Sequence, residues 1–202
     1  IDSNDRAEIE LYINQYPPYS DFNFTSLWAW DTRNERMASL LNGNLVVKFT
    51  DYATDDFFFS FLGTNNVNDT VKKIIDYAKA SGVSPVLRLV PALSVEGVLS
   101  PIFKIEEDRD NFDYIYSTTL LSELKGFNFK DLRRSVNKFS REYPNSKIKI
   151  VSIKEDGVEE NIWSVLRLWN TNKIIQGNEF EIEHEKLAML RLFESSDTDN
   201  LI

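Results

Sequence analysis

A predicted β-hairpin constrains the fold of this chain more than any other feature of its sequence. Two strand-like runs, Arg36–Leu41 and Asn44–Thr50, are joined by the dipeptide Asn42-Gly43. This dipeptide accepts the positive φ angles of a type I′ turn, whose twist matches that of two paired strands. A third run, Phe57–Leu62, is apolar on both faces and is therefore expected to be a central strand. The sequence thus predicts a sheet that starts with antiparallel strands.

Helices and further strands alternate along the rest of the chain. Residues Asn68–Ser81 repeat apolar side chains at helical spacing, and Gly82 ends the pattern. Similar patterns predict helices at Asn4–Ile13, Ser94–Leu99, Phe129–Tyr143, Glu159–Asn172 and Glu181–Glu194, and strands at Val86–Val90, Phe112–Ser117 and Lys147–Ile153. This order predicts an α/β (α+β) fold in which helices flank a mixed sheet.

The last residues of the sequence, TDNLI at 198–202, read as a turn followed by the start of another strand. A sheet that stopped there would leave unpaired backbone groups at its edge. We therefore expect residues 1–202 to be one part of a longer protein, with a second unit beginning as this chain ends.

Composition excludes several classes of protein. Hydrophobic residues make up 42% of the chain and aromatic residues 13%, enough to bury a core, so disorder is not expected. Cysteine is absent, which removes disulfides, thiolate nucleophiles and cysteine-ligated zinc and fits a reducing compartment. The net charge of −9 disfavours nonspecific binding to DNA or to anionic lipid. No apolar run approaches the ~18 residues that span a bilayer, so we predict a cytoplasmic or peripheral protein without a transmembrane segment.

Motifs for nucleophilic or cofactor chemistry are missing from the sequence. His184 is the only histidine and has acids around it, so we interpret it as part of a solvated helix face. No Gly-x-Ser-x-Gly elbow, P-loop or Gly-x-Gly-x-x-Gly run occurs. The Arg/Gln-x-x-Gly-x-Gly loop with which acyl-CoA N-acyltransferases hold pyrophosphate is also absent. The sequence therefore predicts neither a cofactor nor a metal, and it leaves the catalytic residues unassigned.

Arg109 is one candidate for a binding residue. It lies between Asp108 and Asp110, in front of the predicted strand Phe112–Ser117. A guanidinium there can hold a carboxylate or phosphate through two parallel hydrogen bonds. The alternative is a salt bridge to a neighbouring aspartate or an interaction with a helix C-terminus, and the sequence leaves both open.

A basic cluster marks the predicted helix Phe129–Tyr143. Arg133 and Asn137 lie one turn apart, beside the apolar stripe of this helix. A second cationic row consists of Arg134, Lys138 and Arg141. Such a row can dock an anionic partner, such as RNA phosphate or a lipid headgroup. The alternative is an ordinary solvated face that balances an acidic protein.

Two blocks of the sequence carry a family pattern. The first is SDFNFTSLWAWDT, followed by the hairpin RMASLLNGNLVVKF. The second, DRDNFDYIYSTTLLSELKGFNFKDLRRSVNKFSREYP, combines a charged lead, an Asp-Tyr-aliphatic-Tyr strand, a Leu-x-x-Leu-x-Gly turn and a helix with Arg and Asn-x-Phe. Its pattern positions are Asp113, Tyr114, Tyr116, Leu121, Leu124, Gly126, Arg133, Asn137 and Phe139. Together the blocks resemble the phosphatidylglycerol lysyltransferase C-terminal-type family.

The resemblance implies a tandem, GNAT-like acyltransferase fold, of which residues 1–202 would be the first half. Characterised members of the family transfer an aminoacyl group, such as lysyl or alanyl, from tRNA to phosphatidylglycerol at the membrane. The implied partners are an aminoacyl-tRNA or another acyl donor, and a lipid headgroup or small molecule as acceptor. With the charged residues above, the resemblance predicts that Arg109, Tyr114, Arg133 and Asn137 bind substrate.

The sequence also departs from the family. An Asn-Arg-Glu run, an Asp-x-Gly element and an Arg-x-x-Lys element, which mark the family's second half, have no match here. One hypothesis is an aminoacyltransferase in which this chain forms one wall of the cleft. Another is a non-catalytic half that binds substrate or serves as a scaffold. A third, an acyl-CoA-dependent N-acyltransferase, is weakened by the missing pyrophosphate loop.

Overall fold

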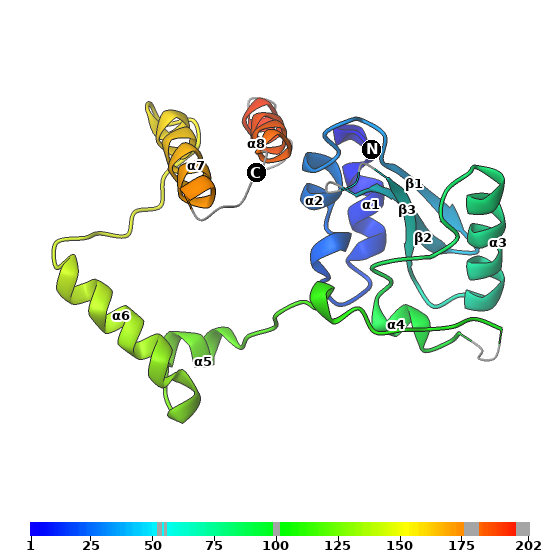
Figure 1. Ribbon diagram of the computed structural model, residues 1–202, viewed down its shortest axis with the longest axis horizontal. Helices are drawn as coiled ribbons and strands as arrows, with labels where there is room; N and C mark the ends of the chain where they lie inside the picture. Colours follow the sequence, from blue (N-terminus) through cyan, green and yellow to red (C-terminus); the bar gives the residue numbers. More distant parts are fainter. Residues whose placement is uncertain (52–53, 55, 99–101, 176–181, 197–202) are drawn as a thin grey trace.

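An antiparallel sheet of three strands lies at the centre of the N-terminal part of the chain (Figure 1). The computed structural model describes residues 1–51, 54, 56–98, 102–175 and 182–196. Strand β1 (Met37–Leu41) pairs with β2 (Asn44–Thr50), and β2 pairs with β3 (Phe57–Leu62). Asn42 and Gly43 both have positive φ angles, 54° and 77°, so the predicted hairpin turn is confirmed.

Helices precede and follow this sheet. The short 3-10 helices are η1 (Ser3–Asp5), η2 (Ser20–Phe22), η3 (Arg109–Asn111) and η4 (Phe127–Phe129). The α-helices are α1 (Arg6–Ile13), α2 (Phe24–Ala29), α3 (Val67–Ala80), α4 (Ala92–Val95), α5 (Thr118–Glu123), α6 (Lys130–Glu142), α7 (Val158–Ile175) and α8 (Glu183–Ser196). The predicted α/β class is confirmed, whereas the strand expected at 198–202 lies outside the described residues.

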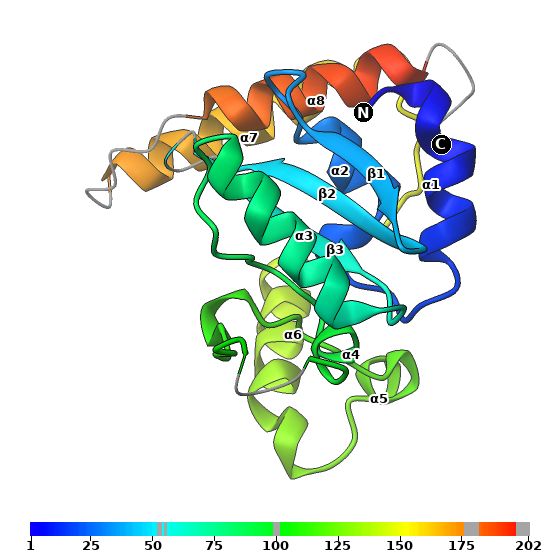
Figure 2. The ribbon, with the colours of Figure 1, turned by 90° about the vertical axis from the view of Figure 1, so that its right-hand side faces the viewer.

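The sheet has an apolar core on each of its faces. Leu45 and Phe49 of β2 belong to the core that α1 and α2 cover. Phe59 and Phe61 of β3 belong to the opposite core, beneath α3 (Figure 2). Phe58 of β3 joins the first core, because successive residues of a strand point to opposite faces. This double role explains why the sequence of β3 is apolar at every position except Ser60.

The outer edge of β3 is paired at one residue. The order β1-β2-β3 makes β2 the middle strand, so the expectation of a central β3 is wrong. The predicted strand at 86–90 is reduced to a parallel bridge between Leu87 and Phe59, beside which the Arg88 N–H donates to the Phe59 carbonyl at 3.1 Å. Leu89 then has a φ angle of 55°, which takes the chain out of the extended conformation. Arg88 is thereby fixed beside the edge of the sheet.

Helix α8 returns to pack against α2, far from it in the sequence. His184 Nδ1 lies 2.9 Å from Thr32 Oγ1. The Arg191 guanidinium donates to the Trp28 carbonyl and to Asn34 Oδ1, and its Cζ lies 5.5 Å from the centre of the Trp28 ring. His184 therefore helps to anchor α8, and the interpretation of it as a merely solvated residue is wrong.

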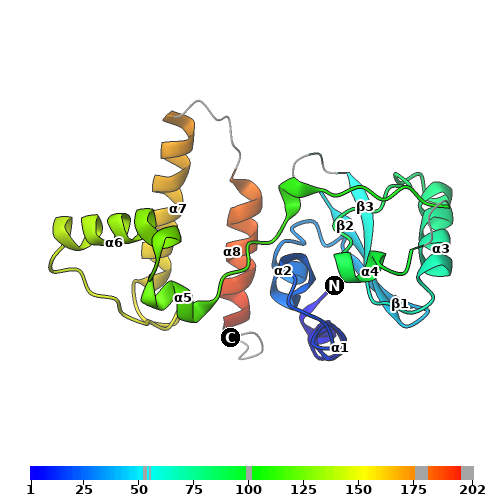
Figure 3. The same cartoon turned by 90° about the horizontal axis from the view of Figure 1, so that it is seen from below.

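Helices α5, α6 and α7 lie apart from the sheet (Figures 1 and 3). We call residues 102–175, which contain these helices, the arm. The segments predicted as strands, Phe112–Ser117 and Lys147–Ile153, lie in the arm and belong to no sheet within the described residues. Tyr114 is 87% exposed. A strand requires a partner strand for its N–H and C=O groups, and no described strand pairs with either of these two segments.

Candidate functional site

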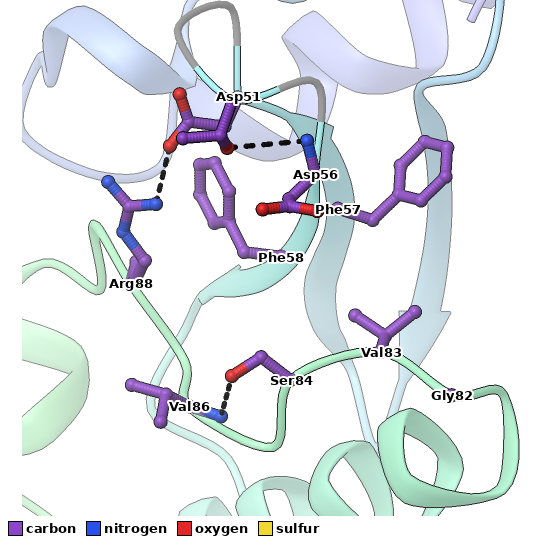
Figure 4. A pocket seen from close by; sticks show the side chains of 10 residues that line it. Asp51, Asp56, Phe57, Phe58, Gly82, Val83, Ser84, Val86 and Arg88 are labelled. Carbon is purple, nitrogen blue, oxygen red and sulfur yellow. Dashed lines mark hydrogen bonds and ion pairs between the residues drawn. The ribbon is translucent and has the colours of Figure 1, made fainter.

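A cavity of about 430 Å³ opens where β2 ends and β3 begins (Figure 4). Its described lining comes from the β2–β3 connection on one side and from residues 82–88, which follow α3, on the other. Asp51 and Asp56 provide carboxylates, Phe57 and Phe58 provide aromatic rings, and Arg88 provides a guanidinium. The cavity therefore combines an apolar wall with charges of both signs, as small-molecule sites do.

An ion pair between Arg88 and Asp51 lies in this cavity. Arg88 Nη1 lies 2.6 Å from Asp51 Oδ2, and the side chain of Asp51 is 13% exposed against 43% for Arg88. The Arg88 guanidinium also lies over the Phe58 ring, with Cζ 4.7 Å from the ring centre. The Asp51 N–H donates to the Asp56 carbonyl at 2.8 Å. The bridge to β3, the ring and the carboxylate together fix Arg88 in one orientation.

The charges of the lining do not favour an anionic ligand. Two carboxylates, Asp51 and Asp56, face one guanidinium, and Asp56 is exposed to solvent. The Ser84 hydroxyl oxygen, labelled in Figure 4, accepts a hydrogen bond from the Val86 N–H at 3.4 Å. The described lining holds no histidine that could activate this hydroxyl. Within its described lining, the cavity therefore holds more carboxylate than guanidinium, a charge balance that suits a cationic group such as an amine better than an anion.

A second group of charges lies where the arm leaves the N-terminal part of the chain. The Ser20 N–H donates to Asp113 Oδ2 at 3.2 Å, which brings Asp113 to the start of η2. Burial raises the pKa of Asp21, and the negative charge of Asp113 raises it further, while Arg36 acts in the opposite direction. Burial, followed by the charges of Glu96 and Asp113, raises the pKa of Tyr19. Sequence reasoning missed Asp21, because no local pattern marks it.

The buried guanidinium of Arg36 supplies the positive charge of this second group. Burial lowers its pKa, against the opposing effects of Asp31 and Asp21. Its Nη1 donates to the Ser26 carbonyl at 3.1 Å, and its Cζ lies 5.3 Å from the centre of the Phe49 ring. Arg36 thus links the charged group to the apolar core of the sheet.

The four residues predicted to bind substrate lie in different parts of the arm. Arg109 is exposed in η3, and within the described residues its side chain forms no hydrogen bond or ion pair, including with Asp108. Tyr114 is exposed in the following segment. Arg133 donates to the Leu124 and Gly126 carbonyls, the second at 2.7 Å, and so closes the turn between α5 and α6.

Asn137 is exposed one turn further along α6. In the described ranges, no hydrogen bond or ion pair joins any two of the four predicted residues. Their role in binding stays a prediction. The contacts of Arg133 give it a structural role in addition, which the sequence did not reveal.

The described residues offer neither a cluster of metal ligands nor a membrane-spanning helix. The described part of the chain contains no group of three or more His, Asp or Glu side chains placed to hold a metal ion. Among the described helices, none has both the length and the apolar composition needed to cross a membrane.

Comparison with known families decides the relationship of this chain. Residues 13–201 match the family described as phosphatidylglycerol lysyltransferase, C-terminal. The chain belongs to this family. Both sequence blocks that resembled the family lie within the matched range, so that prediction is confirmed. A search of the curated proteins finds no match.

One solved structure has the same fold. It is the crystal structure of a conserved protein of unknown function from Bacteroides thetaiotaomicron VPI-5482, with a TM-score of 0.75 and 20% sequence identity. The alignment covers 98% of this chain and 66% of that protein. This phosphatidylglycerol lysyltransferase C-terminal-type chain therefore spans about two thirds of its structural neighbour, and the likeness concerns the fold alone.

Proposed function

We propose that this chain is the first GNAT-like half of an aminoacyltransferase that moves an aminoacyl group from tRNA to phosphatidylglycerol. The observation that supports the proposal is the family match over residues 13–201, which contains both sequence blocks. A second half would complete the cleft and supply the catalytic groups that this sequence lacks.

The proposed reaction exchanges one ester bond for another. A hydroxyl oxygen of the lipid headgroup attacks the carbonyl carbon that links the amino acid to the tRNA. A new ester bond forms to the lipid, the ester bond to the tRNA breaks, and the proton of the attacking hydroxyl passes to the tRNA oxygen, which leaves as a hydroxyl group. Such a reaction depends on the positioning of both substrates and on stabilisation of the oxyanion.

Two features of the chain fit the charges of these substrates. The aminoacyl group carries an ammonium, and the cavity at Arg88 has an excess of carboxylate. The tRNA and the lipid headgroup carry phosphate, and α6 presents the exposed cations Arg134 and Lys138 on one face. These side chains also pair with Asp131 and Glu142, so their positive charge is partly balanced within the helix.

The test is a transfer assay with the protein expressed from its complete reading frame. Labelled lysyl-tRNA or alanyl-tRNA is mixed with phosphatidylglycerol vesicles, and label that enters the lipid fraction is measured. We expect transfer with at least one of the two donors, and a loss of about tenfold or more in kcat/KM for Asp56→Asn, which removes a carboxylate of the cavity, or for Arg109→Ala; this loss corresponds to ~1.4 kcal/mol. Arg167→Ala is the matched control, because Arg167 lies on α7 in an exposed ion pair with Glu160.

A non-catalytic half is the second candidate function. Two observations favour it: Arg88 already pairs with Asp51, and the described cavity lining has no activated nucleophile. In that case the complete protein would bind aminoacyl-tRNA or vesicles without transferring label. Absence of transfer with every donor and lipid tried, in a folded protein that still binds them, would replace the first proposal with this one.

A further inference from the structure

Helix α6 carries an apolar stripe that the described structure leaves uncovered. Leu132, Val136, Phe139 and Tyr143 recur at intervals of three or four residues and share one face. Phe139 and Tyr143 contact each other, yet each is more than half exposed. A stripe of this length is typical of a helix that packs against another layer of structure.

Two segments that flank α6 in the sequence also carry exposed apolar side chains. Ile115 and Tyr116 precede it, Ile148 and Ile150 follow it, and all four are exposed, the two isoleucines at 148 and 150 almost completely. Within the described residues, neither 113–116 nor 147–151 makes a backbone hydrogen bond to another segment. Unpaired β-type segments of this kind are templates for strand addition.

Helix α7 also has an apolar face that the described residues leave exposed. One of its faces meets α8, where the Trp163 and Phe193 rings contact at 5.4 Å between centres. Val165 and Leu168, on another face, are each more than 60% exposed. A helix that is apolar on two faces is normally packed between two layers.

We infer that these faces of the arm are covered, within the same protein, by a further stretch of polypeptide that supplies β-strands. Residues 112–116 and 147–151 would pair with those strands, and the stripe of α6 and the open face of α7 would pack on the resulting sheet. The inference rests on the tandem arrangement in the proposed function and names the surface on which the second half docks.

The structural neighbour favours this occupant over a second copy of the chain. It covers 98% of this chain, including the arm, and its remaining third has no counterpart here. A partner in cis is tethered to the arm and is therefore present there at a high effective concentration. A second copy could pair its own unpaired segments with these only at concentrations that support a dimer, which the test below distinguishes.

The test is hydrogen–deuterium exchange on two proteins: residues 1–202 alone and the protein from the complete reading frame. We expect the amides of 113–116 and 147–151 to exchange at least tenfold more slowly in the complete protein. Ile150→Ser in the complete protein should remove most of this protection. Lys147→Ser is the matched control, because Lys147 is equally exposed but lies out of phase with Ile148 and Ile150.

Each outcome decides the inference. Equal exchange rates in the two proteins would overturn it. Protection in the isolated chain that appears only as the concentration rises, with a dimer in sedimentation, would overturn it in favour of a second copy. Because exchange does not depend on catalysis, protection without aminoacyl transfer would keep this inference and refute the proposed activity.

Discussion

At the scale of single residues, Gly63 shows how closely the end of β3 is packed. Its φ angle is +139°, a region that side chains rarely adopt. The Tyr12 hydroxyl lies 2.6 Å from the Gly43 carbonyl and 3.0 Å from the Leu62 carbonyl, directly beside it. The buried Asn44 side chain accepts from the Asn65 N–H at 3.0 Å and donates to the Asn65 carbonyl at 2.6 Å. These contacts fix the hairpin tip to the start of α3.

Gly63→Ala is therefore expected to destabilise the protein by about 2–4 kcal/mol. The added Cβ would lie 2.6 Å from the Tyr12 hydroxyl and nearer still to Asn44 Oδ1. Urea denaturation measures the free energy of unfolding. Gly82→Ala is the control, since Gly82 also has a positive φ but has open space around it. Equal losses for the two variants would show that the backbone conformation, and not the crowding, sets the cost.

Asp21 should make stability depend on pH in a defined direction. Burial raises its folded-state pKa above the usual value of 3.8, so the folded state binds the proton more tightly than the unfolded chain. Its contribution is most favourable below pH 3.8 and is lost as pH rises through the raised pKa. Asp21→Asn, which cannot ionise, should therefore become more stable relative to wild type between pH 4 and 7.

The measurement is urea denaturation of wild type and variant across that pH range. Asp76→Asn, on the exposed side of α3, is the matched variant against which the effect of replacing an aspartate at the surface is subtracted. A stability difference that stays flat or reverses for Asp21→Asn would contradict the assignment.

At the scale of elements, the docking of α8 on α2 depends on a few polar contacts. Arg191→Met keeps an unbranched chain beside the Trp28 ring but removes the hydrogen bonds to the Trp28 carbonyl and Asn34. We expect a loss of about 1–3 kcal/mol and faster amide exchange in α8. Arg167→Met on α7 is the control. Unchanged exchange in α8 would mean that apolar packing alone holds the helix.

The sequence predicted those elements whose causes are local. The turn at Asn42-Gly43 and the helix α3 follow from dihedral preference and apolar spacing, and both are present. The short bridge at Leu87 was not predicted, because the positive φ of Leu89 is not visible in the sequence. The contact of His184 with Thr32 depends on tertiary packing alone, so the histidine's neighbours in sequence were a poor guide.

At the candidate site, too, the sequence does not reveal contacts that depend on tertiary packing. Arg109 was predicted to bind substrate because charged residues surround it in the sequence. Within the described residues, its side chain forms no hydrogen bond or ion pair. Arg88 and Asp51 form the ordered ion pair of the cavity, although 37 positions separate them and no motif joins them. Their relation depends on the bridge that fixes Arg88 beside β3.

At the scale of the whole molecule, stability is unevenly distributed between the sheet and the arm. Limited trypsin digestion of residues 1–202 should cut first in the arm, at exposed sites such as Lys104 and Arg109. We expect an early fragment that retains β1 to β3, identified by mass spectrometry. Early cleavage at Lys48 in β2 would contradict this order.

The return of α8 to α2 has a consequence for the order of folding. The contacts within the sheet join residues close in sequence, whereas Trp28 and Arg191 are 163 positions apart. Closing so long a loop costs entropy that local contacts do not require. The sheet and α3 can therefore form while the chain is still being synthesised. The outer face of α2 stays exposed until α8, near the end of the sequence, has been synthesised and can cover it. A nascent chain stalled before α8 would display that face, and chaperones that recognise exposed apolar surface would meet it there first.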